Sequence, residues 1–594
     1  MTLFAAIRRE YIYITTVART LWMLRRLKPH ASRTIVDIVE DWARRQPDAP
    51  ALCCRDQAMS YGALDARANA YAHWAIAQGL RRGDCVALLM ENRPDYIAAW
   101  LGLFKAGLTV ALINTNQRGE ALAHSIAIVA ARHVIVGAEL EHVLPEARPF
   151  FADPPRFWIQ DAEGGGDLDA ALATQPATSP GRAPRRDVVL TDRAFYIYTS
   201  GTTGLPKAAN FSHMRMLFMM YGFVGALSPT RRDRIYCPLP LYHATGGVCS
   251  VGLALCHGGV LILRRKFSVS DFWNDIHTYR ATMFSYIGEL CRWLLNAPEG
   301  PHERDHAIRA VTGNGLRPEI WQAFKDRFAI PHIVEFYGAT EGNVSMLNYD
   351  DTVGAVGRVP FYVQKLLPTR VVRFDVEREA PVRGTDGLCI ECAPDEAGEA
   401  VGGISARAGR SFEGYTRKEE SEKKILRDVF RKGDAWFRTG DLLRRDAHDY
   451  FYFVDRIGDT FRWKGENVAT GEVAGALAAV PGVREASVYG VGVPGMDGRA
   501  GMASLVVEDG FDIRGLARQL EGRLPAYARP VFVRLSPAIA VTGTFKQRKV
   551  ELVKDGFDPL RLPDPLYWLD SALGRYEALT PDGFNRIVQG VVKL

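Results

Sequence analysis

Apolar residues along this chain follow two alternating patterns from about residue 34 onward. Three segments have the spacing of helices that bury one side: residues 34–46, 63–79 and 94–105. Three shorter runs are apolar throughout, as in strands buried on both faces: residues 85–90, 109–113 and 194–198. Regular alternation of the two patterns predicts an α/β fold, with helices layered on largely parallel sheets.

The last part of the chain shows the same patterns in shorter segments. Five of them predict a compact α+β module: residues 472–480, 485–493, 502–508, 513–524 and 531–535. A chain of 594 residues should form more than one domain. We predict a basic N-terminal segment (1–30), a large N-terminal domain (31–454) and a small mobile C-terminal domain (455–594), with a boundary near Asp455. The stretch 161–187, rich in Gly, Ala, Pro and Arg, is predicted to be an exposed connection.

The first 28 residues form a segment in which basic residues outnumber acidic ones. Glu10 is opposed by six cations: Arg8, Arg9, Arg19, Arg25, Arg26 and Lys28. At helical spacing one broad face is apolar, with arginines largely opposite: Leu3, Ile7, Ile14, Val17, Leu21 and Leu24. No uninterrupted apolar run reaches about 18 residues, and no cleavage site follows an apolar core, so neither a spanning helix nor a signal peptide is expected. Two interpretations stay open: a helix in a membrane interface, or a helix packed on the protein's own body.

Composition narrows the class of protein. Hydrophobic residues make up 47% of the chain and charged residues 24%, as in an ordinary globular enzyme. The net charge of +6 is too small over this length to indicate nucleic acid binding. Nine cysteines at irregular spacing indicate reduced thiols and a cytoplasmic protein. The CxxC at residues 389–392 has no second Cys or His pair near it in sequence, which disfavours a zinc or redox role.

The densest polar stretch reads YTSGTTGLPK (residues 198–207) and follows an apolar run. Glycines let a backbone approach a ligand closely, while hydroxyl and N–H groups donate hydrogen bonds to anionic oxygens. Lys207 adds a positive charge. The loop is not a Walker A loop, because Lys207 follows Pro206 and precedes Ala208. We predict a loop that wraps a polyphosphate; the alternative is a mobile polar surface loop.

Six further stretches combine glycines, aromatic residues and charged side chains: LPLYHATGG (239–247), TGNGLRPEIW (312–321), EFYGATEGN (335–343), WFRTGDLLRRD (436–446), VDRIGDTFRWKGENV (454–468) and VTGTFKQRK (541–549). With the polar loop, in this order and spacing, they resemble the adenylate-forming superfamily of acyl-CoA synthetases, firefly luciferases and nonribosomal adenylation domains. Within it they resemble the fatty acid transport protein, or very-long-chain acyl-CoA synthetase, branch. The resemblance extends from about residue 35 to residue 590.

That resemblance implies a reaction in two steps. A carboxylate attacks the α-phosphate of ATP to give an acyl adenylate and pyrophosphate; the thiol of coenzyme A then attacks the acyl carbon and AMP leaves. ATP, Mg²⁺ and coenzyme A, the last as a co-substrate, are therefore implied. Because a carboxylate must approach a triphosphate of like charge, catalysis should rest on positioning and electrostatic stabilisation.

The resemblance also assigns nucleotide contacts to several motifs. The residues that would wrap the β- and γ-phosphates are Thr199, Ser200, Gly201, Thr202, Thr203 and Gly204, with Lys207 adding charge. The residues that would lie against the adenine are Gly313, Asn314, Gly315, the stacking Tyr337 and its neighbour Gly338. Asp441 would accept both ribose hydroxyls, and Arg456 would be a second ribose contact.

Catalytic roles follow from the same resemblance. Thr340 would reach the α-phosphate, Glu341 would help hold Mg²⁺, and His243 would lie near the substrate carboxylate. The C-terminal lysine of the family corresponds to Lys546, with Lys549 as the rival position. In many superfamily members that lysine directly follows a glycine, whereas here the run is TGTFK, as in the branch that this chain resembles.

Two further expectations concern the thioester step and the acyl chain. Gly465, which follows Lys464, would let the C-terminal module approach during thioester formation, with a hinge near Asp455. The stretch 282–295 resembles the helix that lines the fatty-acid tunnel; Tyr286 and Gly288 are weak candidates for the pocket, because apolar residues at helical spacing usually form core.

The sequence thus predicts an ATP- and Mg²⁺-dependent acyl-CoA synthetase for long or very long fatty acids, cytoplasmic or peripheral on the cytoplasmic face of a membrane. Three alternatives stay open: a ligase for a bulkier sterol side-chain or bile-type acid, an acyl-AMP ligase that loads a carrier protein, and a fatty-acid transporter or binder. A transporter needs spanning helices, which no segment clearly supplies. A non-catalytic binder should have lost Glu341, Asp441 or Lys546. The oligomeric state is left open, with a dimer among the options.

Overall fold

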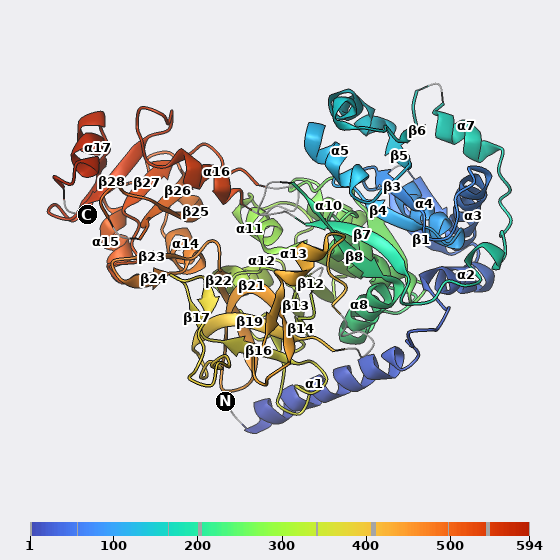
Figure 1. Cartoon of the computed structure of the whole chain (residues 1–594), viewed down its shortest axis with the longest axis horizontal. Helices are drawn as coiled ribbons and strands as arrows, with labels where there is room; N and C mark the ends of the chain where they lie inside the picture. The colour runs from blue at the N-terminus through green and yellow to red at the C-terminus, as the bar shows by residue number, and fades with distance from the viewer. Residues whose placement is uncertain are drawn as a thin grey trace. The chain divides into compact units, whose positions relative to one another are not determined.

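The structure, a computed structural model, describes residues 3–55, 57–163, 165–199, 205–339, 342–405, 412–496, 498–541, 547–592 and 594. The chain divides into two compact units (Figure 1). Unit 1 comprises Met1–Leu316, Ala323–Val353 and Gly403–Ile425; unit 2 comprises Arg317–Gln322, Gly354–Gly402 and Leu426–Leu594. The predicted domain boundary near Asp455 lies within unit 2, so a hinge at that residue stays a prediction.

Unit 1 is built on two sheets. In spatial order, the strands of the first are β14 (Ser345–Leu347), β13 (Ile333–Gly338), β12 (Ala310–Asn314), β11 (Met283–Ile287), β9 (Arg234–Cys237), β10 (Val260–Leu263), β1 (Pro50–Cys54) and β2 (Gln57–Ser60). Neighbouring strands from β13 to β1 are parallel, and the edge strands β14 and β2 are antiparallel. The carboxyl ends of the parallel strands therefore meet at one edge, where α/β proteins bind ligands.

The second sheet of unit 1 follows the same plan. Its strands, in spatial order, are β6 (Arg156–Gln160), β5 (His133–Gly137), β3 (Cys85–Leu89), β4 (Thr109–Leu112), β7 (Arg193–Thr199) and β8 (Lys207–Ser212), with only β8 antiparallel. All residues of α4 (Pro94–Lys105) are buried except Asp95, which is half-buried, and α4 contacts β4 of this sheet and β1 and β2 of the other. A helical layer thus separates the two sheets, which confirms the predicted layered α/β fold of this region.

The remaining helices of unit 1 cover the sheets: α1 (Leu3–Leu24), α2 (Ile35–Arg45), α3 (Tyr61–Ala77), α5 (Gly119–Ala127), α6 (Leu144–Ala147), α7 (Asp167–Ala173), α8 (His213–Leu227), α9 (Val251–Leu255), α10 (Phe272–Thr278), α11 (Gly288–Asn296) and α13 (Lys418–Glu422). Helix α12 (Pro318–Arg327) contributes residues to both units. The predicted helices at 34–46, 63–79 and 94–105 correspond to α2, α3 and α4, and the predicted strands to β3, β4 and β7.

Unit 2 contains two larger sheets. One has the strand order β15 (Gly357–Arg358), β22 (Tyr450–Arg456), β21 (Ala435–Arg445), β19 (Ala397–Gly403) and β16 (Thr369–Val372), with β20 (Ile425–Arg427) paired to β21. The other is formed by β25 (Val483–Val491), β26 (Ala500–Val507), β27 (Phe532–Leu535), β28 (Leu566–Asp570) and β29 (Arg575–Ala578). Two short hairpins complete the strands of this unit: β17 (Phe374–Asp375) with β18 (Ala380–Pro381), and β23 (Phe461–Trp463) with β24 (Glu466–Val468).

The end of unit 2 has a hydrophobic core of its own. Four helices pack in this part of the chain: α14 (Thr470–Ala478), α15 (Leu516–Glu521), α16 (Lys549–Asp555) and α17 (Pro581–Val588). Its core runs from Phe461 to Ile587 and includes Trp463, Leu477 and Phe532. The five predicted segments of the α+β module correspond to α14, β25, β26, α15 and β27.

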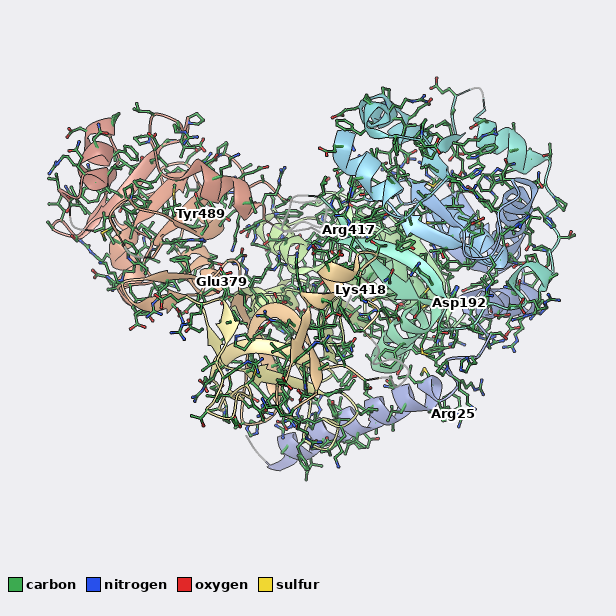
Figure 2. The ribbon with its side chains drawn as sticks, in the orientation of Figure 1. Arg25, Asp192, Glu379, Arg417, Lys418 and Tyr489 are labelled. Carbon is green, nitrogen blue, oxygen red and sulfur yellow. The ribbon has the colours of Figure 1, made fainter. Side chains whose placement is uncertain are left out.

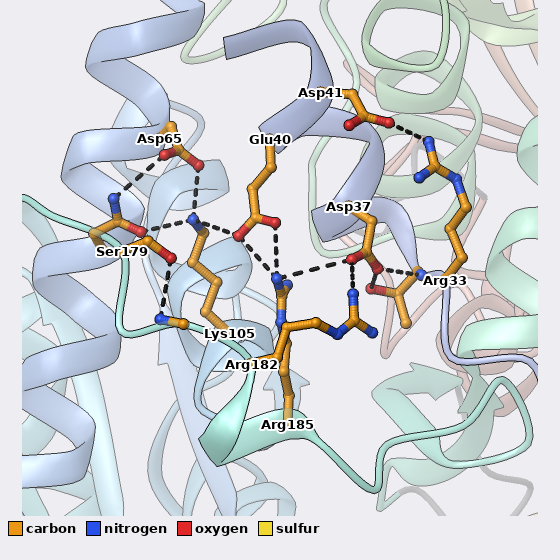
Figure 3. Close-up of polar contacts among 12 residues, drawn as sticks. Arg33, Asp37, Glu40, Asp41, Asp65, Lys105, Ser179, Arg182 and Arg185 are labelled. Carbon is orange, nitrogen blue, oxygen red and sulfur yellow. Dashed lines mark hydrogen bonds and ion pairs between the residues drawn. The ribbon is translucent and has the colours of Figure 1, made fainter. Parts of the chain in front are cut away.

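The prediction for residues 161–187 is wrong in two respects. The stretch contains helix α7, and Arg185 is buried rather than exposed. The Arg185 guanidinium pairs with Glu40 at 2.8 Å, and Arg182 pairs with Asp37, so this stretch is tied to helix α2 (Figure 3). A Gly- and Pro-rich composition predicts a loop, but it does not show which arginines a neighbouring helix will bind.

The stretch 282–295 is also corrected by the structure. Its first half is strand β11 and only its second half is helix α11. The change occurs at Gly288, where an added Cβ would lie 1.7 Å from the carbonyl oxygen of Gly315. The glycine thus lets the start of α11 approach the turn that follows β12.

Helix α1 packs on unit 1 through one face and leaves the other exposed. Its packed side includes Tyr13 and Thr16, with Arg19 Nε donating to the Gly225 carbonyl of α8 at 2.8 Å. Figure 1 shows α1 as a long helix that reaches α8 at its C-terminal end. None of the helices in the described part of the chain is both long and apolar enough to cross a membrane.

Candidate functional site

The turn after β12 is held by a buried glutamate of the neighbouring strand. Glu335 is 1% exposed and lies in β13, opposite Gly313 in the parallel register. Its Oε1 accepts hydrogen bonds from the Gly315 N–H and, at 3.1 Å, from the Leu316 N–H. Gly315 has φ of +85°, in the left-handed region that favours glycine. The carboxyl group therefore determines the course of the Gly313–Gly315 turn, which sequence reasoning placed against the adenine.

Gly313 is small because a tyrosine ring lies across it. Tyr286 of β11 pairs with Gly313 in the register, and its hydroxyl donates to Glu335 Oε2 from the far side of that glycine. A Cβ at Gly313 would lie 2.5 Å from the Tyr286 ring. One polar contact thus spans three adjacent strands, and the weak assignment of Tyr286 to an acyl pocket stays a prediction.

The protonation of Glu335 is unusual for a glutamate. Burial raises its pKa to about 8, although hydrogen bonds from Tyr286, Leu316 and Gly315 act in the opposite direction. The phenol of Tyr286 has its own pKa raised well above the ordinary value, chiefly by burial and then by Glu335. Near neutral pH the carboxyl group is therefore mainly uncharged, and the turn is braced without a net charge beneath it.

Tyr337 and Gly338 end strand β13 beside this turn. Tyr337 is half-buried and pairs with Met346 of β14, while Gly338 is exposed. Because Gly313 is level with Glu335, the Gly313–Gly315 turn and Tyr337 both lie at the carboxyl edge of the same sheet. The structure thus brings together these predicted adenine contacts.

The polar loop begins and ends on paired strands. Thr199 of β7 and Lys207 of β8 are cross-strand neighbours. Lys207 forms an ion pair with Glu420 of α13, and its ammonium lies 5.9 Å from the centroid of the Tyr415 ring. The pKa of Glu420 is lowered, first by its hydrogen bond to Lys207. A phosphate that binds Lys207 must therefore compete with Glu420, a contact that the sequence motif does not reveal.

The His243 motif is held by an asparagine that sequence reasoning missed. Asn92 is buried; its Nδ2 donates to the carbonyl of Leu239 at 2.8 Å, and its Oδ1 accepts the N–H of Leu241 at 2.9 Å. The glycines after His243 start a π-helical turn, Thr245–Ser250. A Cβ at Gly247 would lie 2.0 Å from the Leu241 carbonyl oxygen, which explains the paired glycines of this motif. His243 itself is half-buried, with its ring 4.5 Å from that of Tyr242.

A cavity of about 810 Å³ lies elsewhere on unit 1. It lies at the carboxyl ends of strands from both sheets, and its lining includes Asn92, Arg93, Glu139, Asp161 and Arg264. Arg93 pairs with Glu139 and, at 2.6 Å, with Asp161, so these three charged side chains of the lining bind one another. None of the predicted site residues in the described part of the chain lines this cavity, which is therefore distinct from the predicted nucleotide site.

The two predicted ribose contacts are neighbours in unit 2. Asp441 of β21 lies opposite Arg456 of β22 in the antiparallel register. The backbone before Asp441 is braced by Glu399 of β19, which is 0% exposed and binds the Arg438 guanidinium at 2.8–3.1 Å. The sequence motifs do not reveal this pair of Glu399 with Arg438. The pair holds strand β21 next to β19 at the position of Asp441.

Lys464 and Gly465 form the loop of the β23–β24 hairpin. Trp463 and Glu466 pair on either side of them, and φ is +51° at Lys464 and +82° at Gly465. Positive φ at both positions is the pattern of a type I′ turn. A Cβ at Gly465 would meet nothing within 4 Å. The turn alone thus favours glycine here, so a role in thioester formation stays a prediction.

Because Lys549 stands beside Arg548, the sequence predicts a solvated charge, but the structure binds Lys549 to neighbouring side chains. Its ammonium donates to Thr470 Oγ1 at 2.7 Å and pairs with Asp459 at 3.1 Å. Thr470 in turn donates its N–H and hydroxyl to the buried Asp455. Lys549 is therefore part of a local polar cluster around the predicted hinge and cannot serve as a neutral control for Lys546.

Eight predicted site residues lie outside the described part of the chain: Ser200, Gly201, Thr202, Thr203, Gly204, Thr340, Glu341 and Lys546. Their roles stay predictions, including that of Glu341 as an Mg²⁺ ligand. Among the described residues, the group of side chains spaced to hold a metal is His277, His302 and Asp305, at the surface of unit 1. His277 Nδ1 already bonds to the Asp305 carbonyl oxygen at 2.9 Å, so this group is not arranged as a ready metal site.

Two family models match successive parts of the chain. The AMP-binding enzyme family matches residues 39–385, and the AMP-binding enzyme C-terminal domain matches residues 472–546. The long-chain fatty acid transport protein 2 of Rattus norvegicus is 40% identical over 597 residues, covering 99% of this chain and 95% of that protein.

Solved structures show the same fold. An anthranilate CoA ligase, AuaEII, in complex with anthranoyl-AMP superimposes with a TM-score of 0.75 at 21% identity, over 89% of this chain and 98% of that one. A Mycobacterium tuberculosis fatty acyl CoA synthetase gives a TM-score of 0.61 at 25% identity, over 88% of this chain and 98% of that one. The predicted fold class, a large N-terminal part with a smaller C-terminal one, is thereby confirmed. The chain belongs to the AMP-binding enzyme family and, within it, to the branch of the long-chain fatty acid transport proteins.

Proposed function

We propose that this enzyme activates a long- or very-long-chain fatty acid with ATP and transfers the acyl group to coenzyme A, releasing pyrophosphate and AMP. The observation that carries the proposal is the similarity to long-chain fatty acid transport proteins over nearly the whole chain, together with the braced Gly313–Gly315 turn beside Tyr337. The motifs predict the same activity, that of an AMP-forming acid–thiol ligase.

In the first step a carboxylate oxygen attacks the α-phosphorus and the bond to pyrophosphate breaks. Tyr337 and the Gly313–Gly315 turn hold the adenine, and Asp441 with Arg456 holds the ribose, so the α-phosphate is fixed before attack. Thr340, Lys546 and Lys207 supply donors and positive charge where negative charge accumulates. Glu341 would hold Mg²⁺ through its carboxylate oxygens, and the ion would supply positive charge against the phosphate oxygens.

In the second step the coenzyme A sulfur, having lost its proton, attacks the acyl carbon and AMP leaves. We propose that the C-terminal part, from the hinge near Asp455, moves between the two steps. Gly465 would then approach the acyl adenylate. Asp455, which binds Thr470 and Thr460, would keep the start of α14 ordered at the hinge during this movement.

The direct test is a panel of acids assayed separately for carboxylate-dependent pyrophosphate exchange and for acyl-CoA formation. Long-chain acids should support both activities. Faster turnover of a sterol side-chain or bile-type acid would show that the substrate is the bulkier acid and not a fatty acid. Exchange without acyl-CoA would favour the carrier-loading alternative, and binding without exchange would favour a non-catalytic binder. One methylene is worth about 1–3 kcal/mol in a pocket, so chain-length preference should emerge gradually across the panel.

Lys546 gives a sharper test of the first step. Lys546→Ala should slow pyrophosphate exchange by about two to three decades while sparing conversion of supplied acyl adenylate to acyl-CoA. The matched control is Lys554→Ala, because Lys554 is an exposed lysine of nearby helix α16. If both variants keep full exchange, Lys546 does not stabilise the first step.

Gly465 tests the second step, and its turn geometry decides the control. Gly465→Leu should retain exchange and lose acyl-CoA formation. Gly465→Asn tolerates positive φ, so it preserves the turn with a smaller side chain and should lose less activity. If Gly465→Leu loses both pyrophosphate exchange and acyl-CoA formation while Gly465→Asn keeps them, the change has damaged the hairpin and does not indicate a role in thioester formation.

We also propose that the exposed face of α1 binds an anionic membrane surface. Opposite its packed face, the helix exposes a regular apolar stripe: Phe4 (78% exposed), Ile7 (60%), Tyr11 (69%), Ile14 (53%), Leu21 (39%) and Trp22 (57%). The two alternatives for this segment are therefore not exclusive, because the structure already packs one face on unit 1.

Charge favours lipid as the occupant of this stripe. Arg8, Arg25, Arg26 and Lys28 are exposed beside it, and Figure 2 labels Arg25 at the C-terminal end of the helix. Arg25 lies 4.6 Å and Arg26 5.8 Å from the Trp22 ring. Aromatic and basic side chains on one face suit a helix in the interface of anionic lipids.

Vesicle binding tests this contact without unfolding the helix, because the stripe is exposed. Trp22→Asp should reduce co-sedimentation with anionic vesicles, and high salt should weaken binding of the unmodified protein. Phe150→Asp is the matched control, since Phe150 is 55% exposed elsewhere on unit 1. Equal binding by both variants would contradict the proposal, and a monomer–dimer shift in Trp22→Asp would make the stripe a contact between copies.

A further inference from the structure

Glu335 is a buried ionisable group that the proposed chemistry does not use. Its side-chain hydrogen bonds connect it to the predicted adenine site. The carboxyl group binds two N–H groups of the turn on one side and the Tyr286 hydroxyl on the other. Its own strand continues directly to Tyr337. One side chain thus connects both halves of the predicted adenine site.

We propose that Glu335 is a positioning residue for ATP, which holds the Gly313–Gly315 turn in the shape that accepts the adenine and releases it when the carboxyl group ionises. This inference rests on the proposed adenylation activity. The uncharged carboxyl group can accept the two N–H groups through Oε1 and donate its own hydrogen from Oε2 to the Tyr286 oxygen, whereas the ionised group accepts from the Tyr286 hydroxyl. Ionisation places a negative charge in an apolar surrounding, which favours opening of this corner to water.

The neighbouring ionisable groups leave Glu335 as the one that changes charge near pH 8. Tyr286 from β11 and Cys291 from α11 face it, and burial raises the pKa of both well above their ordinary values. Glu289 acts on this cluster from α11, and Asp351 acts on Tyr286 from the segment after β14. Because these two outer groups are acidic, they cannot offset the charge of an ionised Glu335.

The contacts also distinguish positioning from simple core packing. An apolar residue at position 335 could fill the space, but it would leave the N–H groups of Gly315 and Leu316 without their acceptor. Glutamine keeps an acceptor for these N–H groups and a donor for Tyr286, and it cannot ionise. The pair Glu335→Ala and Glu335→Gln therefore separates the brace from the charge.

The experiment measures KM for ATP, KM for the acid and kcat across pH for the full-length enzyme, together with direct binding of AMP. Glu335→Ala should raise KM for ATP and the dissociation constant of AMP about tenfold, with a smaller change in KM for the acid. In the unmodified enzyme, affinity for AMP should fall as pH rises through about 8, following ionisation of Glu335. Glu335→Gln should bind AMP normally at neutral pH and lose this alkaline fall.

Glu141→Gln is the matched control, because Glu141 is an exposed glutamate of unit 1. It should keep the alkaline fall. An unchanged fall in Glu335→Gln would overturn the inference, as would Glu335→Ala with equal losses in kcat and both KM values. If the unmodified protein activates no acid, the proposed function fails, while AMP binding across pH still decides the role of Glu335.

Discussion

Each unit holds a fully buried glutamate behind a predicted nucleotide contact. The negative charge of each glutamate is compensated in a different way. In unit 2, Glu399 is 0% exposed and binds the Arg438 guanidinium through both oxygens at 2.8–3.1 Å. In unit 1, Glu335 is 1% exposed and is bound by backbone N–H groups and a tyrosine hydroxyl. One carboxylate is paired with a cation, and the other is bound by dipoles.

The difference shows that burial alone does not determine what a glutamate does. A buried carboxylate needs either an opposite charge or a proton, because desolvation penalises the isolated anion. Arg438 supplies the charge at Glu399. At Glu335 burial raises the pKa to about 8, so near neutral pH a bound proton, and not a cation, removes the negative charge. Unit 2 therefore gains a permanent ion pair behind Asp441, whereas unit 1 gains a brace that responds to pH.

The pH dependence of stability should show the largest effect. The pKa of Glu335 rises from 4.5 in the unfolded chain to about 8 in the folded one, so the folded state favours the proton. Its contribution is complete below about pH 4.5 and is lost as pH rises through about 8. The loss between about pH 5 and pH 9 should be on the order of 4 kcal/mol.

Urea unfolding across pH, with Glu335→Gln as the reference, isolates this contribution from those of other groups. The unmodified protein should lose stability relative to the variant up to about pH 8 and then stay level. A constant difference between the two proteins at all pH values would mean that Glu335 does not titrate in this range.

Much of this architecture could be predicted from the sequence. Helices α2, α3 and α4 and strands β3, β4 and β7 follow from apolar spacing, because each buries a continuous side. The motifs also placed Gly313–Gly315, Tyr337, Asp441 and Arg456 at the nucleotide, and the structure pairs Asp441 with Arg456 across two strands. Short-range pattern is sufficient for these elements, while the contacts of the motif residues with the nucleotide stay predictions.

The two braces could not be predicted in that way. Tyr286 and Glu335 are 49 residues apart, and their contact depends on the register of three strands and on the absence of a side chain at Gly313. Glu399 and Arg438 are 39 residues apart on strands β19 and β21. A glutamate within a strand pattern gives no sign of its partner, since register and burial are settled by the whole sheet. For the same reason the sequence around Lys549 gives no sign of its contact with Thr470, which is 79 residues away.

Removing the charge of Glu399 should lower stability by less than ionisation of Glu335 does. The loss should still exceed that caused by the substitutions at Gly313 and Tyr286 described below. Glu399→Gln leaves the Arg438 guanidinium without its anion, which should destabilise unit 2 by about 2–4 kcal/mol. The lower part of this range applies if solvent screens Arg438, whose side chain is 26% exposed. Urea unfolding with hydrogen exchange at β19 and β21 measures the loss and locates it.

Two results of this experiment would contradict the comparison. If Glu399→Gln is as stable as the unmodified protein, the pair of Glu399 with Arg438 does not stabilise unit 2. If the double variant Glu399→Leu/Arg438→Met is no more stable than Glu399→Gln, the loss does not come from an unpaired guanidinium. We expect the double variant to regain part of the stability, because it leaves no buried charge.

Gly313→Ala should disturb the unit 1 brace by a steric route. The added Cβ would lie 2.3 Å from the Tyr286 carbonyl oxygen and 2.5 Å from its ring, so strand or ring must shift. Such overpacking costs about 1–3 kcal/mol. Weaker AMP binding should accompany the loss of stability in calorimetry. Gly222→Ala is the control, because a Cβ there meets nothing within 4 Å in helix α8; equal losses in both variants would remove the special role of Gly313.

Tyr286→Phe makes the smallest change and tests the direction of coupling within the brace. Loss of one hydrogen bond should cost about 1 kcal/mol. The Tyr286 hydroxyl lowers the pKa of Glu335, so its removal should raise that pKa and shift the alkaline fall in AMP affinity to higher pH. Tyr61→Phe is the matched control, because Tyr61 is buried in unit 1 and its hydroxyl donates to the Gly259 carbonyl at 2.8 Å. It should lose similar stability without moving the pH profile. A shift to lower pH in Tyr286→Phe would mean that the tyrosine opposes the charge of Glu335 instead of stabilising it, which would contradict a hydroxyl that donates to that carboxylate.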